Sequence, residues 1–305
     1  MPPDTAFAVL SDRLFMSAAA VYVLAMLAHA AEYARARTAT PVGAGTPIPA
    51  GVDRPATDRF GRVAVALTVL GAVLHLGSVA ARGVATARWP LGNMYEFDAA
   101  ICLFAVATWL AAVRAAPNLR RMGVFVLVPV LVLMFLGGTV LYAKAAAVTP
   151  PLQTFWLAIH VTAVASASGL LLVAGVASIA YLAARSARAA AAAPRLLAVL
   201  PPPDALDRVA YRVTTIAFPL FTFAVVAGAI WAEAAWGRFW GWDPKETVAF
   251  VSWVVYAAYL HARATAGWRA ERAAWINTLG FATMVMNLFF VNLVVAGLHS
   301  YAGLD

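Results

Sequence analysis

The sequence predicts an all-α fold, a polytopic transmembrane helical bundle, and three observations indicate it: the composition, the length of the apolar runs and the placement of the basic residues. Hydrophobic residues occupy 63% of the 305 positions and charged residues 12%, and the mean hydropathy is +0.81. Soluble domains carry roughly 25% charged residues, so this composition excludes an ordinary soluble domain. We expect residues 1–305 to form a single integral membrane domain.

Apolar runs of sufficient length define about eight spans. A helix needs about 20 apolar residues to cross a hydrocarbon core of about 30 Å. The first run lacks a basic leader and a clear cleavage site, so we expect a retained helix rather than a removed signal peptide. The predicted spans are approximately 11–33, 62–82, 97–116, 122–143, 155–184, 210–232, 246–262 and 274–297.

The basic residues predict the orientation of these spans. Sixteen of the 22 Lys and Arg residues lie in the first, third, fifth and seventh connections. Because cytoplasmic loops carry the excess of Lys and Arg, we expect both termini and the connection between the sixth and seventh spans to be extracytoplasmic. The arginines form no continuous stripe, so the net charge of +8 reflects topology in a lipid bilayer, and we expect no nucleic-acid partner.

The connection between the sixth and seventh spans concentrates aromatic residues. Within residues 236–246, here named the tryptophan loop, Trp236, Phe239, Trp240 and Trp242 are followed directly by charged groups. A platform of aromatic rings beside polar groups is typical of a site for a large planar ligand. The alternative is an interfacial aromatic belt, which is common in membrane proteins; the positions of the histidines favour the ligand site.

The end of the tryptophan loop has the pattern of a helix start. Asp243, Pro244 and Glu246 predict a capping box, with Asp243 as the N-cap, proline at the first helical position and Glu246 reaching back from the third. For Asp243 and Glu246, this structural role and a direct role in ligand binding remain alternatives.

The histidines suggest the identity of the planar ligand. His160 lies near the outer end of the fifth predicted span, and His299 follows the last span on the same side. Two imidazoles are good axial ligands for the iron of a porphyrin, and indoles suit its faces and edges. Lys245 and Arg238 are then candidates to receive the propionates. Zinc is a competing ligand of the two histidines, but no evident third ligand accompanies them.

The remaining histidines are predicted to lie elsewhere. His261 follows Pro244 by 17 residues, about 26 Å along a helix, and therefore lies towards the cytoplasmic leaflet. We interpret it as a second site on a path across the membrane, separate from the outer pair of histidines. His29 and His75 are interpreted as hydrogen-bonded packing or interface residues. The single cysteine, Cys102, excludes both a disulfide framework and a Cys-x-x-Cys-His motif, so the chain does not itself attach haem by thioether bonds.

At these residues the chain resembles a known family. The tryptophan-rich signature, also called the WWD signature, and the sequences around the histidines are similar to those of the CcsA/ResC family of system II cytochrome c biogenesis, and the resemblance covers about residue 88 to the end. The matching runs are Trp231–Thr247, Trp156–His160, Tyr259–Arg263, Gly297–Gly303 and Pro90–Glu96.

The resemblance implies a function and a set of partners. Such proteins work with a CcsB/ResB-type membrane protein to move haem b outwards and attach it to Cys-x-x-Cys-His apocytochromes c, as part of a holocytochrome c synthase, or haem lyase. It implies that His160 and His299 ligate an external haem, that the tryptophan loop holds it, and that His261 ligates haem within the membrane opposite a ligand from the partner. The haem-handling core is then about 145–305, in a bacterial plasma membrane, or a thylakoid membrane in plastid relatives.

Two other functions remain open. A transporter of another amphipathic ligand would use the tryptophan loop as a gate, without bound iron and with polar groups along a path near the midplane. A structural assembly subunit would tolerate replacement of Trp240 and Trp242 by alanine. The haem-delivery hypothesis requires no catalytic residue in this chain, because the thiols of the apocytochrome form the new bonds.

Overall fold

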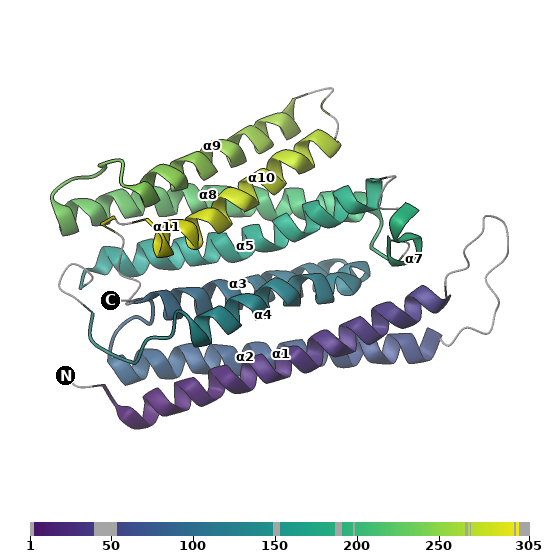
Figure 1. The fold of residues 1–305 in the computed structure, drawn as a ribbon, viewed down its shortest axis with the longest axis horizontal. Coiled ribbons are helices and arrows are strands. Elements are labelled where there is room, and N and C mark those ends of the chain that lie inside the picture. Colours follow the sequence, from purple (N-terminus) through teal and green to yellow (C-terminus); the bar gives the residue numbers. More distant parts are fainter. Residues whose placement is uncertain are drawn as a thin grey trace.

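The computed structural model describes residues 3–39, 54–148, 153–186, 191–197, 199–265, 268, 270–295 and 297–298. Within these ranges every regular element is a helix, in agreement with the predicted all-α fold (Figure 1). The elements are α1 (Thr5–Ala39), α2 (Arg54–Thr86), α3 (Met94–Ala115), the 3-10 helix η1 (Pro117–Met122), α4 (Gly123–Thr139), α5 (Phe155–Arg185), α7 (Pro194–Leu197), α8 (Pro203–Trp236), α9 (Pro244–Ala264), α10 (Ala270–Leu288) and α11 (Phe290–Leu293).

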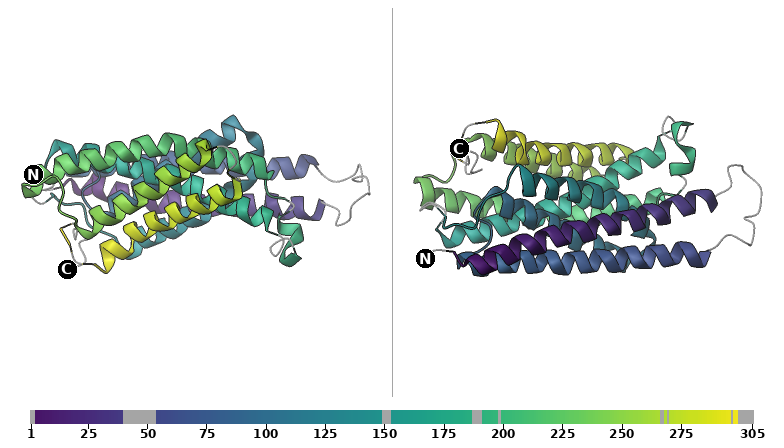
Figure 2. Two further views of the ribbon diagram at one scale, coloured as in Figure 1. Left: turned by 90° about the horizontal axis from the view of Figure 1, so that it is seen from above. Right: turned by 60° about the horizontal axis from the view of Figure 1, so that its bottom comes forward.

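The long helices run side by side along one axis of the molecule (Figures 1 and 2). The pairs α1–α2 and α3–α4 form one half, and α5, α8, α9 and α10 form the other. The start of α1, the connection from α8 to α9, and α11 all lie at the same end of the bundle. We call this end the tryptophan end.

Seven of the described helical segments are long and apolar enough to cross a membrane, so the chain is an integral multi-pass membrane protein. The span predicted at 246–262 also forms a helix, α9, but α9 is not among the seven, because Lys245, Glu246, His261 and Arg263 lower its hydropathy. The seven segments are Thr5–Ala36, Asp58–Thr86, Met94–Ala115, Pro117–Thr139, Phe155–Arg185, Pro203–Trp236 and Ala270–Asn292.

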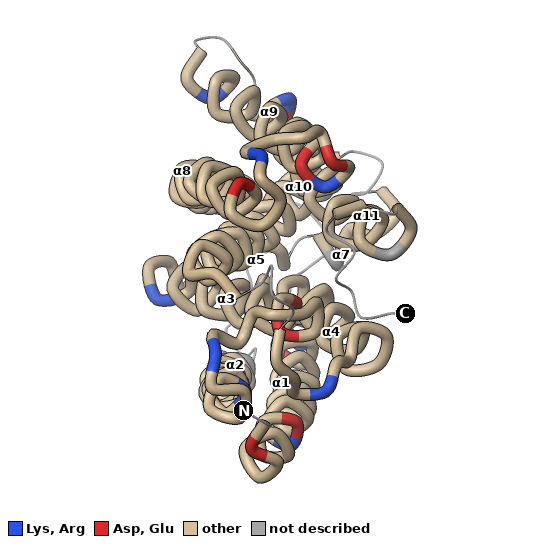
Figure 3. Tube along the Cα trace, turned by 90° about the vertical axis from the view of Figure 1, so that its left-hand side faces the viewer, with Lys and Arg blue, Asp and Glu red and all other residues tan. Residues whose placement is uncertain are grey.

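Helix α5 is the most buried of the candidate spans, because 72% of the residues in its 18-residue apolar stretch are buried inside the bundle. Figure 3, which looks along the bundle, shows α5 between α3, α8 and α10. Small residues permit this close approach, as is usual between membrane helices. A Cβ atom at Gly169 would lie 2.7 Å from the backbone nitrogen of Ala105 and 2.8 Å from the carbonyl oxygen of Ile101, so α3 and α5 touch backbone to backbone there.

A buried carboxylate fixes the connection between α2 and α3 at the tryptophan end. Glu96 accepts hydrogen bonds from Arg82 (3.1 Å), from Arg88 (2.7 and 2.9 Å) and from the backbone nitrogen of Gly92 (2.7 Å). The indole of Trp89 in this connection donates to the hydroxyl of Thr162 on α5, at 2.8 Å. The N-terminal half is thereby attached to α5 close to His160.

The two unassigned histidines lie inside the N-terminal half. His75 on α2 is fully buried and makes edge contacts with the rings of Phe15 and Tyr22. His29 on α1 is 2% exposed, contacts Trp109 edge to face and lies 3.8 Å from Glu32. Neither lines the cavity between the two halves of the bundle. Both rings pack against aromatic side chains, but their nitrogens have no hydrogen-bond partner among the described residues, so the expectation of hydrogen-bonded packing residues is met only in the packing.

We predict that Gly169→Ala destabilises the protein by about 1–3 kcal/mol, because the added methyl group must displace backbone atoms of α3 and cores resist added volume. The measurement is thermal unfolding of the detergent-solubilised protein. Gly77→Ala on α2 is the matched control, since its Cβ would approach only Leu14, at 3.4 Å. Equal stability of the two variants would contradict the close approach of α3 and α5.

Candidate functional site

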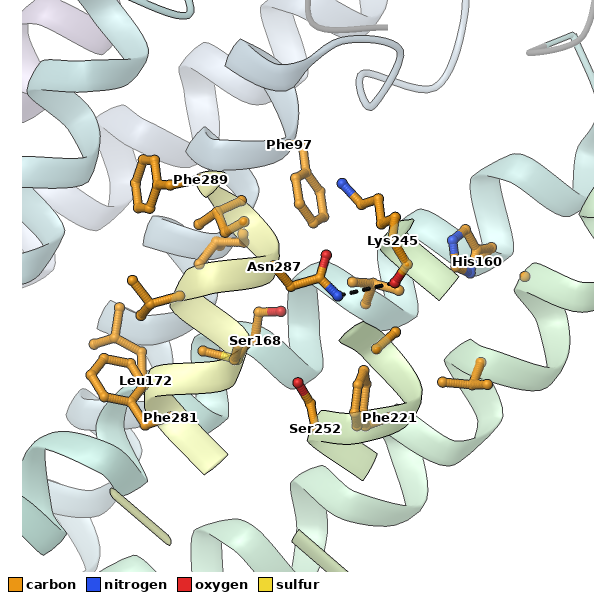
Figure 4. A pocket seen from close by; sticks show the side chains of 18 of the residues that line it. Phe97, His160, Ser168, Leu172, Phe221, Lys245, Ser252, Phe281, Asn287 and Phe289 are labelled. Carbon is orange, nitrogen blue, oxygen red and sulfur yellow. Dashed lines mark hydrogen bonds between the residues drawn. The ribbon is translucent and has the colours of Figure 1, made fainter. Parts of the chain in front are cut away.

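A cavity of about 510 Å³ lies between the two halves of the bundle, close to the tryptophan end (Figure 4). Helices α3, α4, α5, α8, α9 and α10 and the tryptophan loop all contribute to its lining. Its volume is within the range of about 300–1,000 Å³ that is usual for sites of organic ligands. Most lining residues are aliphatic or aromatic; the polar ones are His160, Ser168, Lys245, Glu246, Ser252 and Asn287. Such a wall suits a large, mainly apolar ligand with a few polar groups.

The second turn of α5 presents His160 to this cavity. Its Nδ1 atom lies 2.8 Å from the carbonyl oxygen of Ala224 on α8. A carbonyl oxygen only accepts hydrogen bonds, so Nδ1 carries the proton and the lone pair is on Nε2. This is the tautomer in which a histidine binds a metal ion while its other nitrogen donates to a carbonyl.

An indole from α8 supports the imidazole. The rings of His160 and Trp231 are stacked, with centroids 6.0 Å apart and an interplanar angle of 8°. Trp231 in turn contacts Trp236 edge to face, at 4.8 Å. Trp231 is absent from the predicted site residues because it lies before the tryptophan loop. Its place in the run Trp231–Thr247 was the signal that could have identified it.

The aromatic residues of the tryptophan loop divide between two surroundings. Trp240 and Phe239 line the cavity, whereas Trp242 is 66% exposed. The rings of Trp240 and Trp242 meet at 90°, and Phe250 of α9 contacts both. The cluster therefore presents ring edges as well as faces. The backbone of Trp242 has a φ of 58°, a conformation that is uncommon outside glycine.

Hydrogen bonds within the loop hold this shape. One carboxylate oxygen of Glu246 accepts from the backbone nitrogens of Gly241 (2.9 Å) and Asp243 (3.1 Å), and the other accepts from Arg238 (3.2 Å). The predicted capping box at the start of α9 is present. Glu246 is buried and Arg238 half-buried, so the ion pair between them lies inside the loop and stabilises its conformation.

Asp243 links the loop to the segment after α11. Its side chain is 7% exposed; Oδ2 accepts from the backbone nitrogen of Lys245, and Oδ1 accepts from the backbone nitrogen of Leu298 at 2.8 Å. His299, the next residue in the chain, lies outside the described residues. The predicted pairing of His160 with His299 therefore stays a prediction.

Lys245 is the cation among the described residues that line the cavity. It lies in the first turn of α9, before the apolar span 246–262, and its Nζ donates to Oδ1 of Asn292. Burial lowers the pKa of the Lys245 ammonium from 10.5 to about 8, because a low-dielectric environment disfavours the charged form. Figure 4 shows Lys245 and His160 on the same side of the cavity. The Lys245 ammonium can therefore pair with an anionic group of a ligand that His160 binds.

His261 is separate from this group. It is exposed in the last turn of α9, at the end of the helix opposite to Lys245. A helix of 21 residues is about 31 Å long, and His261 does not line the cavity. The structure thus brings together His160, Trp240 and Lys245 and leaves His261 apart, on an outer surface of the bundle.

Comparisons with known proteins agree on one family. Residues 91–299 match the family model described as cytochrome C assembly protein. The cytochrome c biogenesis protein CcsA of Gloeobacter violaceus is 30% identical over 281 residues, covering 75% of this chain and 83% of that protein. CcsA of Guillardia theta is 37% identical over 177 residues, 53% of this chain and 59% of the relative.

A shorter match has higher identity. CcsA of Synechococcus elongatus is 53% identical over 98 residues, which are 32% of this chain and 30% of that protein. The chain thus matches less than a third of the length of this relative.

We predict that Asp243→Ala loosens both the loop and the segment that contains Leu298. Loss of the N-cap costs about 0.5–2 kcal/mol, and the hydrogen bond to Leu298 is lost as well. Hydrogen exchange at the backbone amides of Leu298 and Lys245 should accelerate at both positions, whereas Asp243→Asn, whose single amide oxygen accepts only one of the two hydrogen bonds, should retain slow exchange at one of them. Asp4→Ala is the control, because Asp4 caps α1 at the same end through Ala6 and Phe7. Slow exchange of Leu298 in Asp243→Ala would contradict the link.

Proposed function

The chain belongs to the cytochrome c assembly protein family, and from this premise we propose that it takes part in cytochrome c maturation, receiving haem b and presenting it at the outer membrane face to Cys-x-x-Cys-His apocytochromes c. The observation that carries the proposal is the geometry of His160. It combines an apolar cavity of about 510 Å³ with an imidazole whose Nδ1 proton is engaged by a carbonyl oxygen.

The lining residues fit a porphyrin. Trp240 and Phe239 supply aromatic surface at the mouth of the cavity, and aliphatic residues of α4 and α10 supply the apolar floor. When bound, haem supplies the iron and the two vinyl groups with which apocytochrome thiols react. The chain itself holds the ring, orients its edge and excludes water. None of these tasks requires a nucleophile, so we assign no catalytic residue.

We propose His299 as the second iron ligand. The hydrogen bond from Leu298 to Asp243 supports this assignment, because it holds the preceding residue against the start of α9. Of the two candidates for the propionates, Lys245 lines the cavity, whereas Arg238 is engaged by Glu246. Lys245 is therefore the preferred partner of a propionate, and Arg238 a secondary one that would first have to leave Glu246.

We propose that the tryptophan end is extracytoplasmic and that both termini lie on that side. The excess of arginine in the odd-numbered connections supports this orientation. It requires residues 246–262 of α9 to cross the membrane as an eighth span, and a helix of 17 residues, about 26 Å long, is at the short end of the range that crosses a hydrocarbon core. The cell membrane of a bacterium is the location that this topology and the bacterial relatives support.

We further propose a partner of the CcsB/ResB type, with which the chain forms a holocytochrome c synthase. His261 is exposed at the inner end of α9, where an imidazole contributed by another protein can approach it. Haem bound between His261 and the partner's imidazole would occupy an inner site, from which haem would reach the outer cavity. A transporter of another amphipathic ligand is the alternative, and it differs in requiring no iron.

We predict that purified protein carries haem with the low-spin absorbance spectrum of two axial imidazoles, and that His160→Ala converts the outer haem to a high-spin species and lowers its content. Removal of an axial ligand is the physical reason. His75→Phe is the control, because it replaces a buried ring that does not line the cavity. An unchanged low-spin spectrum in His160→Ala would exclude the site, and the absence of haem from active wild-type protein would favour the transporter.

We predict that Lys245→Met weakens haem binding about ten- to a hundredfold at pH 7, since a hydrogen bond to a charged group contributes about 1.5–3 kcal/mol. The pKa of about 8 gives the sign of the pH dependence: the ammonium is present below pH 8 and lost above it. Wild-type affinity in a haem titration should fall as the pH rises beyond 8, and Lys245→Met should show no such fall. Lys245→Arg should bind equally well at pH 7 and pH 9.

A further inference from the structure

One face of α8 forms the surface on which His160 rests. Ala224, Gly228 and Trp231 follow one another at spacings of four and three residues, so they share a face of the helix. The carbonyl oxygen of Ala224 lies 2.8 Å from Nδ1 of His160, and the indole of Trp231 is stacked on the imidazole. Gly228, which also lines the cavity, lies between them.

There is no room for a side chain at position 228 while the imidazole is in place. A Cβ atom there would lie 2.6 Å from Cε1 and 2.7 Å from Nδ1 of His160. Real Cβ contacts are never this short, so the ring lies directly against the backbone of α8. A glycine in a helix interior costs about 1 kcal/mol relative to alanine. The position of Gly228 under the imidazole ring explains why a glycine occurs here in spite of this cost.

The missing side chain also exposes a hydrogen-bond acceptor. Within an α-helix, the carbonyl oxygen of residue 224 accepts the backbone N–H of residue 228, and one lone pair remains. A side chain at position 228 would stand over that lone pair. Without one, Nδ1–H of His160 reaches the oxygen at 2.8 Å.

We infer that Gly228 is the positioning residue for His160: it admits the imidazole to the face of α8, directs Nδ1–H to the carbonyl of Ala224 and thereby leaves Nε2 as the iron-binding atom. The inference rests on the proposed function, because it assigns a role in haem ligation. Gly228 acts through its contact with His160. Trp231, on the same face of α8, stacks on the ring and limits its rotation.

The inference differs from a purely structural role for Gly228 in the close contact of α5 with α8. A structural glycine would lower stability whether or not His160 is present. A positioning glycine would lose its effect once His160 is removed, because the space taken by the methyl group is then vacant. The two cases are separated by a double-mutant cycle of positions 160 and 228.

The first experiment compares haem content and absorbance of four proteins: wild type, Gly228→Ala, His160→Ala and the double variant. We expect Gly228→Ala to lower haem affinity about ten- to a hundredfold, the usual effect of losing a group that orients a metal ligand, and to give the high-spin spectrum of His160→Ala. Added imidazole should restore the low-spin spectrum in both. The double variant should resemble His160→Ala, and Gly138→Ala, whose Cβ would meet only Phe15 at 3.4 Å, should resemble wild type.

The second experiment needs no haem. Nitrogen-15 chemical shifts of His160 in haem-free protein should indicate a proton on Nδ1 in wild type and its transfer to Nε2, or a mixture, in Gly228→Ala. If Gly228→Ala fails to fold because of the clash, the double variant, in which the ring is absent, should fold, and this rescue would itself support the contact.

The outcomes that overturn the inference are distinct from those that overturn the proposed function. A low-spin spectrum and an Nδ1 proton that persist in Gly228→Ala overturn the inference and leave haem binding intact. An equal loss of haem on adding Gly228→Ala to the His160→Ala background also overturns it, in favour of a structural role. Wild-type protein without bound haem overturns the proposed function, and the inference with it.

Discussion

The burial of α5 in the middle of the bundle is the constraint on which the rest of the structure depends. Backbone contact at Gly169 brings α5 against α3, and the opposite side of α5 packs on α8. The two halves of the bundle are thereby joined along a single helix. The cavity lies beside the part of that helix nearest the tryptophan end, where His160, Val164 and Ser168 contribute to its lining. Both the depth of His160 and the width of the cavity follow from this arrangement.

The charged residues near the cavity have two different tasks. Glu246 and Asp243 accept hydrogen bonds from backbone nitrogens, and Arg238 binds Glu246, so these three stabilise the tryptophan loop and its connection to Leu298. Lys245 and His160 face the cavity. A low-dielectric surrounding makes an unpaired charge costly, which explains why most charges here are satisfied by the protein and few are left for a ligand.

The N-terminal half supports this site and lines one side of it through α3 and α4. Clusters of ion pairs hold its helices at both ends, around Glu96 at the tryptophan end and around Arg120 at the other, where Arg120 binds Glu32 and Asp58. Salt bridges inside a membrane protein fix geometry, because breaking one leaves a buried charge without a partner. The bond from Trp89 to Thr162 transmits this fixed geometry to α5.

The sequence by itself determined the all-helical membrane fold, the helix start at Asp243 and the presence of an aromatic loop beside charged groups, because apolar runs, capping boxes and loop composition depend on residues close together in the chain. It also predicted site roles for His160 and Lys245, which the structure places in the lining of one cavity. Only the tertiary structure decided that Glu246 and Arg238 bind one another, that the indoles meet edge to face, and that Ala224, Gly228 and Trp231 surround His160. The contacts of His160 join α5 to α8 across more than 60 residues. No local pattern encodes which face of one buried helix meets which face of another.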